Sequence, residues 1–161
     1  MRIGILSDTH IPTRARELPT EVISGMTGVD LIIHAGDIVE QSVLSTLAAI
    51  APVHAVHGNM DPPPLRRALP RTRVVEVQGY RIGVIHGDGR YGSVLTRALS
   101  AFEDVNCIVF GHSHRPVCTR YGDLLLLNPG SPTDRRLSPK HSYAILTVSA
   151  AGLEGEIVYF D

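Results

Sequence analysis

The sequence predicts an α/β fold in which two mixed β-sheets pack face to face and helices flank them. Three observations support this prediction. Short apolar runs rich in β-branched residues recur along the chain, helical segments separate these runs in the first half, and short turns separate them in the second half. A chain of 161 residues suits one domain with a full core. We therefore expect residues 1–161 to form a single domain.

Five apolar runs each end in polar residues, and they are expected to be β-strands. They do not alternate between polar and apolar residues, which is typical of strands that are buried on both faces. The expected strands are residues 2–6, 30–35, 52–56, 80–85 and 107–110.

Helical segments fit between several of these strands. Residues 39–50 and 91–102 carry apolar side chains at helical spacing. A shorter helix is expected at residues 21–26, after Pro19, with Thr20 as its N-cap. Alternation of strands and helices predicts parallel strands in this half of the chain.

The second half of the chain has a different pattern. Short turns such as Gln78-Gly79 and Ala151-Gly152 separate its apolar runs, which predicts hairpins and a second, more antiparallel sheet. We interpret Pro62–Pro64 as a stiff loop and not as a domain boundary. The strands expected here are residues 73–77, 80–85, 124–127, 142–148 and 156–160.

Composition excludes several classes of protein. The formal net charge is −1 and no basic stripe is present, so the sequence carries no strong nucleic-acid signal. No apolar stretch approaches the roughly 20 residues needed to span a bilayer, and the N-terminal apolar segment is too short for a signal peptide. We therefore expect a cytoplasmic protein without a membrane partner. Cys107 and Cys118 form no CxxC motif and are expected to be buried free thiols.

Polar side chains able to bind metal ions follow all five expected strands of the first set. Ligands of α/β sheets bind beyond the carboxyl ends of strands, and a nearby glycine or sharp turn can aim each side chain at a common centre. A single motif of this kind is often only a loop histidine, but five in order favour one metal site. Mixed oxygen and imidazole ligands suit manganese, iron, zinc or nickel. The candidates are Asp8, His10, Asp37, Asn59, His86, His112 and His114.

The order of these motifs closely resembles the calcineurin-like metallophosphoesterase superfamily. The matching motifs are Asp8-x-His10, Gly36-Asp37, Gly58-Asn59-x-Asp61, His86-Gly87 and Gly111-His112-x-His114. The length and the NPGSP stretch at residues 128–132 resemble its small bacterial and archaeal phosphodiesterase branch, to which the retromer subunit Vps29 is related. The family fold is a pair of sheets flanked by helices, in agreement with the pattern above.

The resemblance implies two metal ions, with the two histidines of GHSH serving different ions. Residues i and i+2 of an extended segment project to the same side, so we expect this stretch to reach both ions. The implied ligands of the first ion are Asp8, His10, Asp37 and His114. Those of the second are Asp37, Asn59, His86 and His112, so that Asp37 bridges the two ions. The implied catalytic residues are Asp37, Asn59 and His86.

The activity that the resemblance implies is phosphodiester hydrolysis by a metal-bridging hydroxide, with Mn²⁺ the first choice of ion and Ni²⁺, Fe²⁺ or Zn²⁺ as alternatives. Met60 stands where many members have a histidine that protonates the leaving group. This difference favours a small phosphodiester whose leaving group departs without help. The alternatives are a phosphomonoesterase or nucleotidase that uses the same site, and a non-catalytic Vps29-like binding scaffold. Self-association into a homo-oligomer is plausible.

Other polar residues have supporting or structural interpretations. Asp61 completes the GNxD match and is expected to orient a ligand loop. Asp88 either positions a water or a ligand histidine, or is a plain turn residue, and Arg135 is a candidate phosphate contact. Asn128 and Ser131 are expected to form a tight turn near the site. Three further histidines are expected to be packed and hydrogen-bonded, namely His34, His54 and His57.

Overall fold

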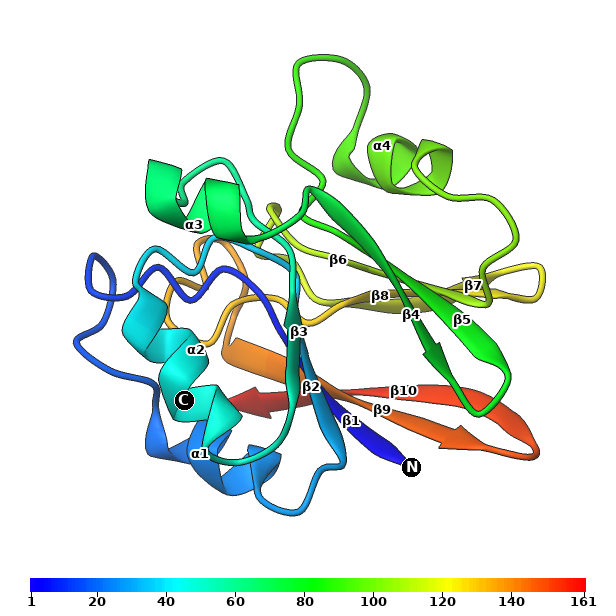
Figure 1. The fold of residues 1–161 in the computed structure, drawn as a ribbon, viewed down its shortest axis with the longest axis horizontal. Helices are drawn as coiled ribbons and strands as arrows, with labels where there is room; N and C mark the ends of the chain where they lie inside the picture. The colour runs from blue at the N-terminus through cyan, green and yellow to red at the C-terminus, as the bar shows by residue number, and fades with distance from the viewer.

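A computed structural model describes residues 1–161 and contains ten strands and four helices. Two five-stranded sheets face each other, with helices on their outer sides, which confirms the predicted fold class (Figure 1). In chain order the elements are β1 (Arg2–Leu6), α1 (Thr20–Met26), β2 (Leu31–His34), α2 (Gln41–Ala48), β3 (Val53–Ala55), α3 (Pro63–Ala68), β4 (Thr72–Val77), β5 (Tyr80–Ile85), α4 (Val94–Ser100), β6 (Cys107–Phe110), β7 (Val117–Tyr121), β8 (Leu124–Asn128), β9 (His141–Ser149) and β10 (Gly152–Phe160).

The two sheets are both mixed. The first has the order β10-β9-β1-β2-β3, with β1, β2 and β3 parallel, β9 antiparallel to β1, and β10 antiparallel to β9. The second has the order β4-β5-β6-β8-β7, with β5, β6 and β8 parallel. The parallel strands predicted for the first half of the chain are therefore present in both sheets.

The expectation that the strands of the second half share one sheet is wrong. The β9–β10 hairpin leaves the second sheet and extends the first, where β9 pairs with β1 along residues 144–147. β9 and β10 are the longest strands of the chain, and β10 forms one edge of the first sheet. Strand pairing of this kind depends on contacts between distant segments, and the local pattern of β9 is the same in either sheet.

Both faces of the central strands are buried, which explains their continuous apolar runs. In β1, Ile3 and Ile5 point into the core between the sheets, whereas Leu6 packs with α1 and α2 on the outer face. In the second sheet, Val109 faces the same inner core, whereas Ile108 packs outward with residues of α4. Each layer of helices therefore buries one outer face, and polar groups reach the interior mainly beyond the strand ends.

Three local predictions differ from the structure. Pro62–Pro64 is not only a loop, because α3 begins at Pro63. Proline suits the first turn of a helix, where its fixed φ is helical and its missing N–H would have no partner. Thr20 is the first residue of α1 and makes no N-cap hydrogen bond, and Pro19 occupies the cap position. Strand β7 was not predicted, because most of its residues are exposed and form no apolar run.

No helix of the structure is long and apolar enough to cross a membrane. The two cysteines are free thiols as predicted, but only Cys107 is buried, and Cys118 is exposed on β7. Burial raises the pKa of the Cys107 thiol to about 12 and raises the pKa of Cys118 to a smaller degree.

We expect only Cys118 to react with a water-soluble aromatic disulfide reagent in the native protein at pH 8. Cys107 is enclosed in the core, and its raised pKa leaves almost no thiolate at that pH. Spectrophotometric titration should count one reactive thiol in buffer and both in denaturant. Reaction of both thiols at the same rate in buffer would contradict the burial of Cys107.

Candidate metal centre

The predicted ligand residues lie beyond the carboxyl ends of parallel strands from both sheets. The loops after β1 and β2 come from the first sheet, and those after β5 and β6 come from the second. Five of these residues are buried, each with at most 5% of its surface exposed. These are Asp8, His10, Asp37, His86 and His114.

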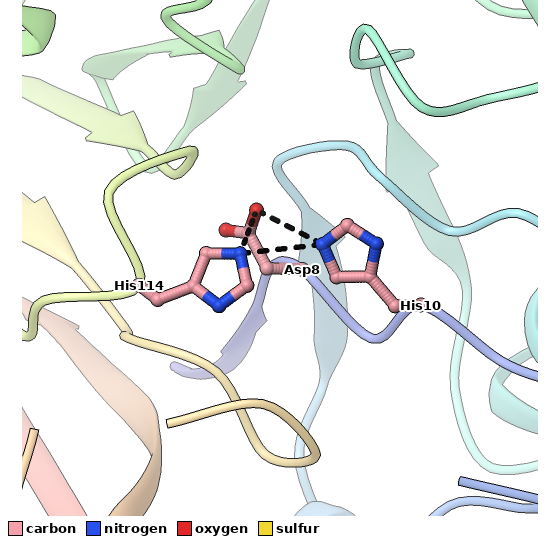
Figure 2. Close-up of side chains that lie close together, drawn as sticks. All are labelled: Asp8, His10 and His114. Carbon is pink, nitrogen blue, oxygen red and sulfur yellow. Dashed lines mark hydrogen bonds and ion pairs between the residues drawn. The ribbon is translucent and has the colours of Figure 1, made fainter. Parts of the chain in front are cut away.

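One group of three ligand side chains forms where the loop after β1 meets the loop after β6 (Figure 2). The Nε2 atom of His114 lies 3.2 Å from Oδ1 of Asp8, and the Nε2 atom of His10 lies 3.7 Å from the same oxygen. The two Nε2 atoms are themselves 3.2 Å apart. Three possible metal-ligand atoms, from loops that follow strands of two different sheets, are thus close enough to bind one ion.

A second group consists of Asp37, His86 and His112, whose candidate ligand atoms all lie within 4.8 Å of one another. The Nε2 atom of His86 is 3.1 Å from Oδ2 of Asp37. The same Oδ2 atom lies 3.6 Å from Nε2 of His10, which belongs to the first group. The carboxylate of Asp37 therefore lies between the two groups.

Each carboxylate directs one oxygen at the histidines and uses the other to accept hydrogen bonds. Oδ2 of Asp8 accepts hydrogen bonds from the Ser7 hydroxyl at 2.6 Å and from the backbone N–H of His112 at 2.9 Å. Oδ1 of Asp37 accepts a hydrogen bond from the backbone N–H of Met60 at 2.8 Å. These bonds fix the orientation of both carboxylates and leave Oδ1 of Asp8 and Oδ2 of Asp37 facing the centre.

Backbone carbonyls orient two of the histidines. Nδ1 of His86 lies 2.8 Å from the Ala35 carbonyl oxygen, and Nδ1 of His114 lies 2.5 Å from that of Asp134. A ring nitrogen beside a carbonyl must carry a proton, so Nε2 is the nitrogen of each ring that faces the carboxylates and that could bind a metal ion. Metal-binding histidines are typically held in this way.

The centre has buried charges and two buried polar atoms without hydrogen-bond partners, and both features fit a bound cation. Oδ1 of Asp8 and Nε2 of His86 are buried without a hydrogen-bond partner and lie 3.9 Å apart. Burial opposes charge on both groups, but the neighbouring histidines outweigh it and hold the pKa of Asp8 far below its usual range. Burial likewise lowers the pKa of His86, yet Asp37 and Asp8 outweigh it and raise that pKa to about 9. Divalent ions would neutralise these carboxylates, and Oδ1 of Asp8 and Nε2 of His86 could both coordinate them.

The prediction that GHSH is extended is wrong. His112 and His114 have φ angles of 67° and 57°, in the left-handed region. The other candidates in the same region are Asp8 at 55°, His10 at 42° and Asp37 at 55°. Residues other than glycine rarely adopt this conformation, which costs of order 1–3 kcal/mol each. The side chains converge because of these turns and not because of the alternation of an extended strand.

The glycines near the site mainly make room for ligands. A Cβ atom at Gly58 would lie 2.2 Å from Oδ1 of Asp37, and one at Gly111 would lie 1.9 Å from the Ser7 hydroxyl. Gly36 and Gly87 do have positive φ angles, of 95° and 93°, as turns require. The expected role of glycine, to let the chain turn, therefore applies to Gly36 and Gly87, whereas Gly58 and Gly111 leave room for neighbouring side chains.

Asp61 contacts the loop that carries Asp37. Its two carboxylate oxygens accept hydrogen bonds from four backbone N–H groups, at 3.0 Å from Asp37, 2.8 Å from Ile38, 2.7 Å from Val39 and 2.7 Å from Gly58. Asp61 is 2% exposed, and three of these four hydrogen bonds are buried, while that from Val39 is partly buried. These contacts are those expected of a residue that orients a ligand loop.

The other predicted residues lie at the edge of the centre. Asn59 is exposed, next to Gly58. Asp88 is half-buried and forms an ion pair with Arg71 at 3.5 Å. The guanidinium of Arg135, the candidate phosphate contact, donates hydrogen bonds to the carbonyls of Ser138 and Pro139 in its own loop.

The histidines predicted to be structural make hydrogen bonds outside both groups. Nε2 of His34 is 3.1 Å from the Thr9 hydroxyl, and its Nδ1 accepts a hydrogen bond from the N–H of Gly36 at 3.2 Å. Nδ1 of His54 is 3.3 Å from the Arg73 guanidinium. His57 is half-buried, with Nδ1 3.5 Å from the Gly58 carbonyl.

Sequence reasoning missed three residues that contact ligand residues, namely Ser7, Thr133 and Asp134. Ser7 donates to Asp8, Thr133 donates to the Thr9 carbonyl, and the carbonyl of Asp134 faces His114. No local motif marks them. Only the neighbouring NPGSP stretch indicated that this part of the chain lies near the site.

Comparisons with known proteins show the family and the fold. A model of the calcineurin-like phosphoesterase superfamily domain matches residues 1–151. A probable metallophosphoesterase of Methanothermobacter thermautotrophicus is 39% identical across 98% of this chain and 92% of its own. A phosphodiesterase of Methanocaldococcus jannaschii is 29% identical across 81% of this chain and 83% of its own. The crystal structure of Chaetomium thermophilum Vps29 has a TM-score of 0.78 at 22% identity and covers 99% of this chain and 97% of that one, which is a likeness of fold.

Replacing Asp61 with asparagine should destabilise the protein by about 3 kcal/mol, because an amide offers one acceptor oxygen and leaves two of the four buried N–H groups facing its NH₂. Urea denaturation measures the loss. The matched control is Asp30→Asn, an exposed carboxylate that accepts from the backbone N–H of Arg2 alone, and it should cost less than about 1 kcal/mol. Equal losses in the two variants would show that Asp61 does not organise this loop.

Proposed function

The chain belongs to the calcineurin-like phosphoesterase superfamily, and on this basis we propose that it is a dinuclear metal-dependent phosphodiesterase. The observation that carries the proposal is the meeting of two ligand groups around one carboxylate oxygen. Oδ2 of Asp37 lies 3.1 Å from Nε2 of His86 in one group and 3.6 Å from Nε2 of His10 in the other. A single carboxylate in this position is suited to bridge two ions.

The residues that would hold the ions follow from this grouping. Asp8, His10 and His114 would bind the first ion, and His86 and His112 would bind the second, with Asp37 shared between them. Asn59 would complete the second set, since it follows Gly58 at the exposed side of the centre. The donor set of carboxylate, imidazole and amide suits Mn²⁺, with Ni²⁺, Fe²⁺ and Zn²⁺ as alternatives.

Two divalent ions bound here would supply Lewis acidity toward a phosphoryl oxygen and would activate a water molecule as nucleophile. The protein groups contribute by position. Asp8 and Asp37 present one oxygen each from fixed orientations, and Nδ1 contacts to carbonyls hold the rings of His86 and His114. Because these contacts exist before substrate binds, little reorganisation is required during the reaction.

The residue after Asn59 supports a diester as the substrate. Met60 is 57% exposed, and its thioether has no proton to give to a leaving group. A reaction without this general acid requires a leaving group that departs as a stable anion. The name of the Methanocaldococcus jannaschii relative, a phosphodiesterase, supports the same class of substrate.

The test is hydrolysis of bis(4-nitrophenyl) phosphate by the purified protein with added Mn²⁺. Asp37→Ala and His86→Ala should each lower the rate by more than about 100-fold, because changes that only touch metal ligands already cost about 10–100-fold. His54→Ala, which removes a histidine outside both groups, should keep the wild-type rate. Elemental analysis of the same preparations identifies the ion.

Two outcomes would contradict this function. Wild-type protein that is inert with Mn²⁺, Ni²⁺, Fe²⁺ and Zn²⁺ would favour the binding scaffold. A higher kcat/KM for 4-nitrophenyl phosphate than for the diester would make the protein a phosphomonoesterase.

Introducing a proton donor beside the centre should help substrates whose leaving group is poorer. We expect Met60→His to raise the ratio of diphenyl phosphate to bis(4-nitrophenyl) phosphate turnover more than about tenfold, because phenolate departs less readily than 4-nitrophenolate and a well-placed general acid contributes about 10²–10⁴-fold. Met60→Leu keeps an apolar side chain without a proton and is the matched control. Steady-state kinetics on the two substrates measures the ratio, and an equal change in both variants would refute a role for proton donation.

A further inference from the structure

The connection between β8 and β9 crosses from the second sheet to the first and passes beside the candidate metal centre. Several polar side chains from Asn128, the last residue of β8, onward are buried, with 0% exposure for Asn128, 1% for Ser131 and 6% for Ser138. Buried polar groups of this kind need partners. Their partners are backbone groups of the two loops that carry the first ligand group.

Two hydroxyls of the connection donate to the loop after β1. Oγ of Ser131 donates to the Asp8 carbonyl at 2.7 Å, and Oγ1 of Thr133 donates to the Thr9 carbonyl at 2.6 Å. Asp8 has a left-handed backbone conformation, so its carbonyl does not belong to the strand ladder. The hydroxyl of Ser131 therefore satisfies a carbonyl that the strained ligand loop leaves buried.

Other groups of the connection contact the loop after β6. The amide of Asn128 donates to the Gly111 carbonyl at 3.0 Å, and the hydroxyl of Ser138 donates to the His114 carbonyl at 3.1 Å. The carbonyl of Asp134 lies 2.5 Å from Nδ1 of His114. This loop is therefore held on its backbone and on its ligand side chain.

The hydroxyl of Ser131 joins the two sets of contacts. While it donates to Asp8, it accepts hydrogen bonds from the N–H groups of Asp134 at 2.9 Å and Thr133 at 3.3 Å. Asp134 is the residue whose carbonyl orients His114. One buried oxygen thus couples the backbone of one ligand to the residue that aims another ligand from the opposite sheet.

We propose that Ser131 is a positioning residue that fixes the distance between Asp8 and His114 and so sets the affinity of the first metal site. The inference rests on the proposed metal-dependent function. The second group is held by other contacts, from the Ala35 carbonyl to His86 and from Asp61 to the Asp37 loop. Loss of the Ser131 hydroxyl therefore acts on one site of the two.

The test is titration of metal-free protein with Mn²⁺ by calorimetry, together with the visible absorption spectrum of the Co²⁺-loaded form, which reports ligand geometry. Ser131→Ala should weaken one site about 10–100-fold, the effect typical of partners that hydrogen-bond to metal ligands, and leave the other site unchanged. The Co²⁺ spectrum should change in the bands of the weakened site alone.

Ser142→Ala is the matched control. Ser142 is also 1% exposed and donates to a carbonyl at the same distance, 2.7 Å, but its acceptor is Pro129 and not a ligand residue. The two variants should lose similar stability, and Ser142→Ala should bind both ions with wild-type affinity. Thr133→Val removes the bond to Thr9 at 2.6 Å and a longer contact to the Asp8 carbonyl at 3.4 Å. It should weaken the same site to a smaller degree and serves if Ser131→Ala does not fold.

Two results would overturn the inference. Wild-type affinities at both sites in Ser131→Ala, or equal effects in Ser131→Ala and Ser142→Ala, would refute a positioning role while leaving the phosphodiesterase proposal intact if the wild-type protein is active. Wild-type protein that binds no divalent ion would contradict both proposals, and its inactivity on the diester would identify that case.

Discussion

The whole centre depends on keeping two buried carboxylates charged. Burial alone raises the pKa of Asp8 and of Asp37, and isolated charges in a protein interior are very costly. Histidines around them reverse the effect and lower both pKa values. The histidines balance part of this negative charge. Oδ1 of Asp8 and Nε2 of His86 are nevertheless buried without a hydrogen-bond partner and lie 3.9 Å apart. The interior is therefore arranged for cations, which explains why the region is polar in an otherwise apolar sandwich.

Strained backbone at the centre also lowers the stability of the protein. Ligand residues in both sheets have left-handed conformations that their side chains do not favour, as in Asp8, Asp37 and His114. Such conformations persist where many hydrogen bonds determine them together. Asp61 supplies four of these bonds to the loops after β2 and β3, and the β8–β9 connection supplies others to the loops after β1 and β6. The supporting residues are as much a part of the site as the ligands.

The packing of two sheets connects the fold to this chemistry. The first group needs Asp8 from one sheet and His114 from the other, with Nε2 and Oδ1 only 3.2 Å apart. The inner core of Ile3, Ile5, Val84 and Val109 holds the sheets at a constant separation. The β8–β9 connection adds a covalent link between them. The crystal structure of Chaetomium thermophilum Vps29 has this fold at 22% identity.

Much of the fold and most of the candidate ligands could be predicted from the sequence, because they depend on local patterns. Apolar runs buried on both faces defined β1, β5 and β6, and the polar residues after them marked the strand ends where ligands gather. The family resemblance ordered these residues into two sets, and the structure brings Asp8, His10 and His114 together in one group and Asp37, His86 and His112 in another.

Tertiary structure alone decided which strands share a sheet, how the ligands turn and what holds them. The β9–β10 hairpin could have extended either sheet by its own pattern, and its pairing with β1 depends on residues more than a hundred positions away. The left-handed turn at His112 replaced the expected extended segment, because hydrogen bonds from other loops outweigh local preference. The NPGSP stretch placed Ser131 near the site, but no sequence pattern indicated the role of Ser131 or Asp134, since that role consists of contacts with Asp8 and His114, which only folding brings near.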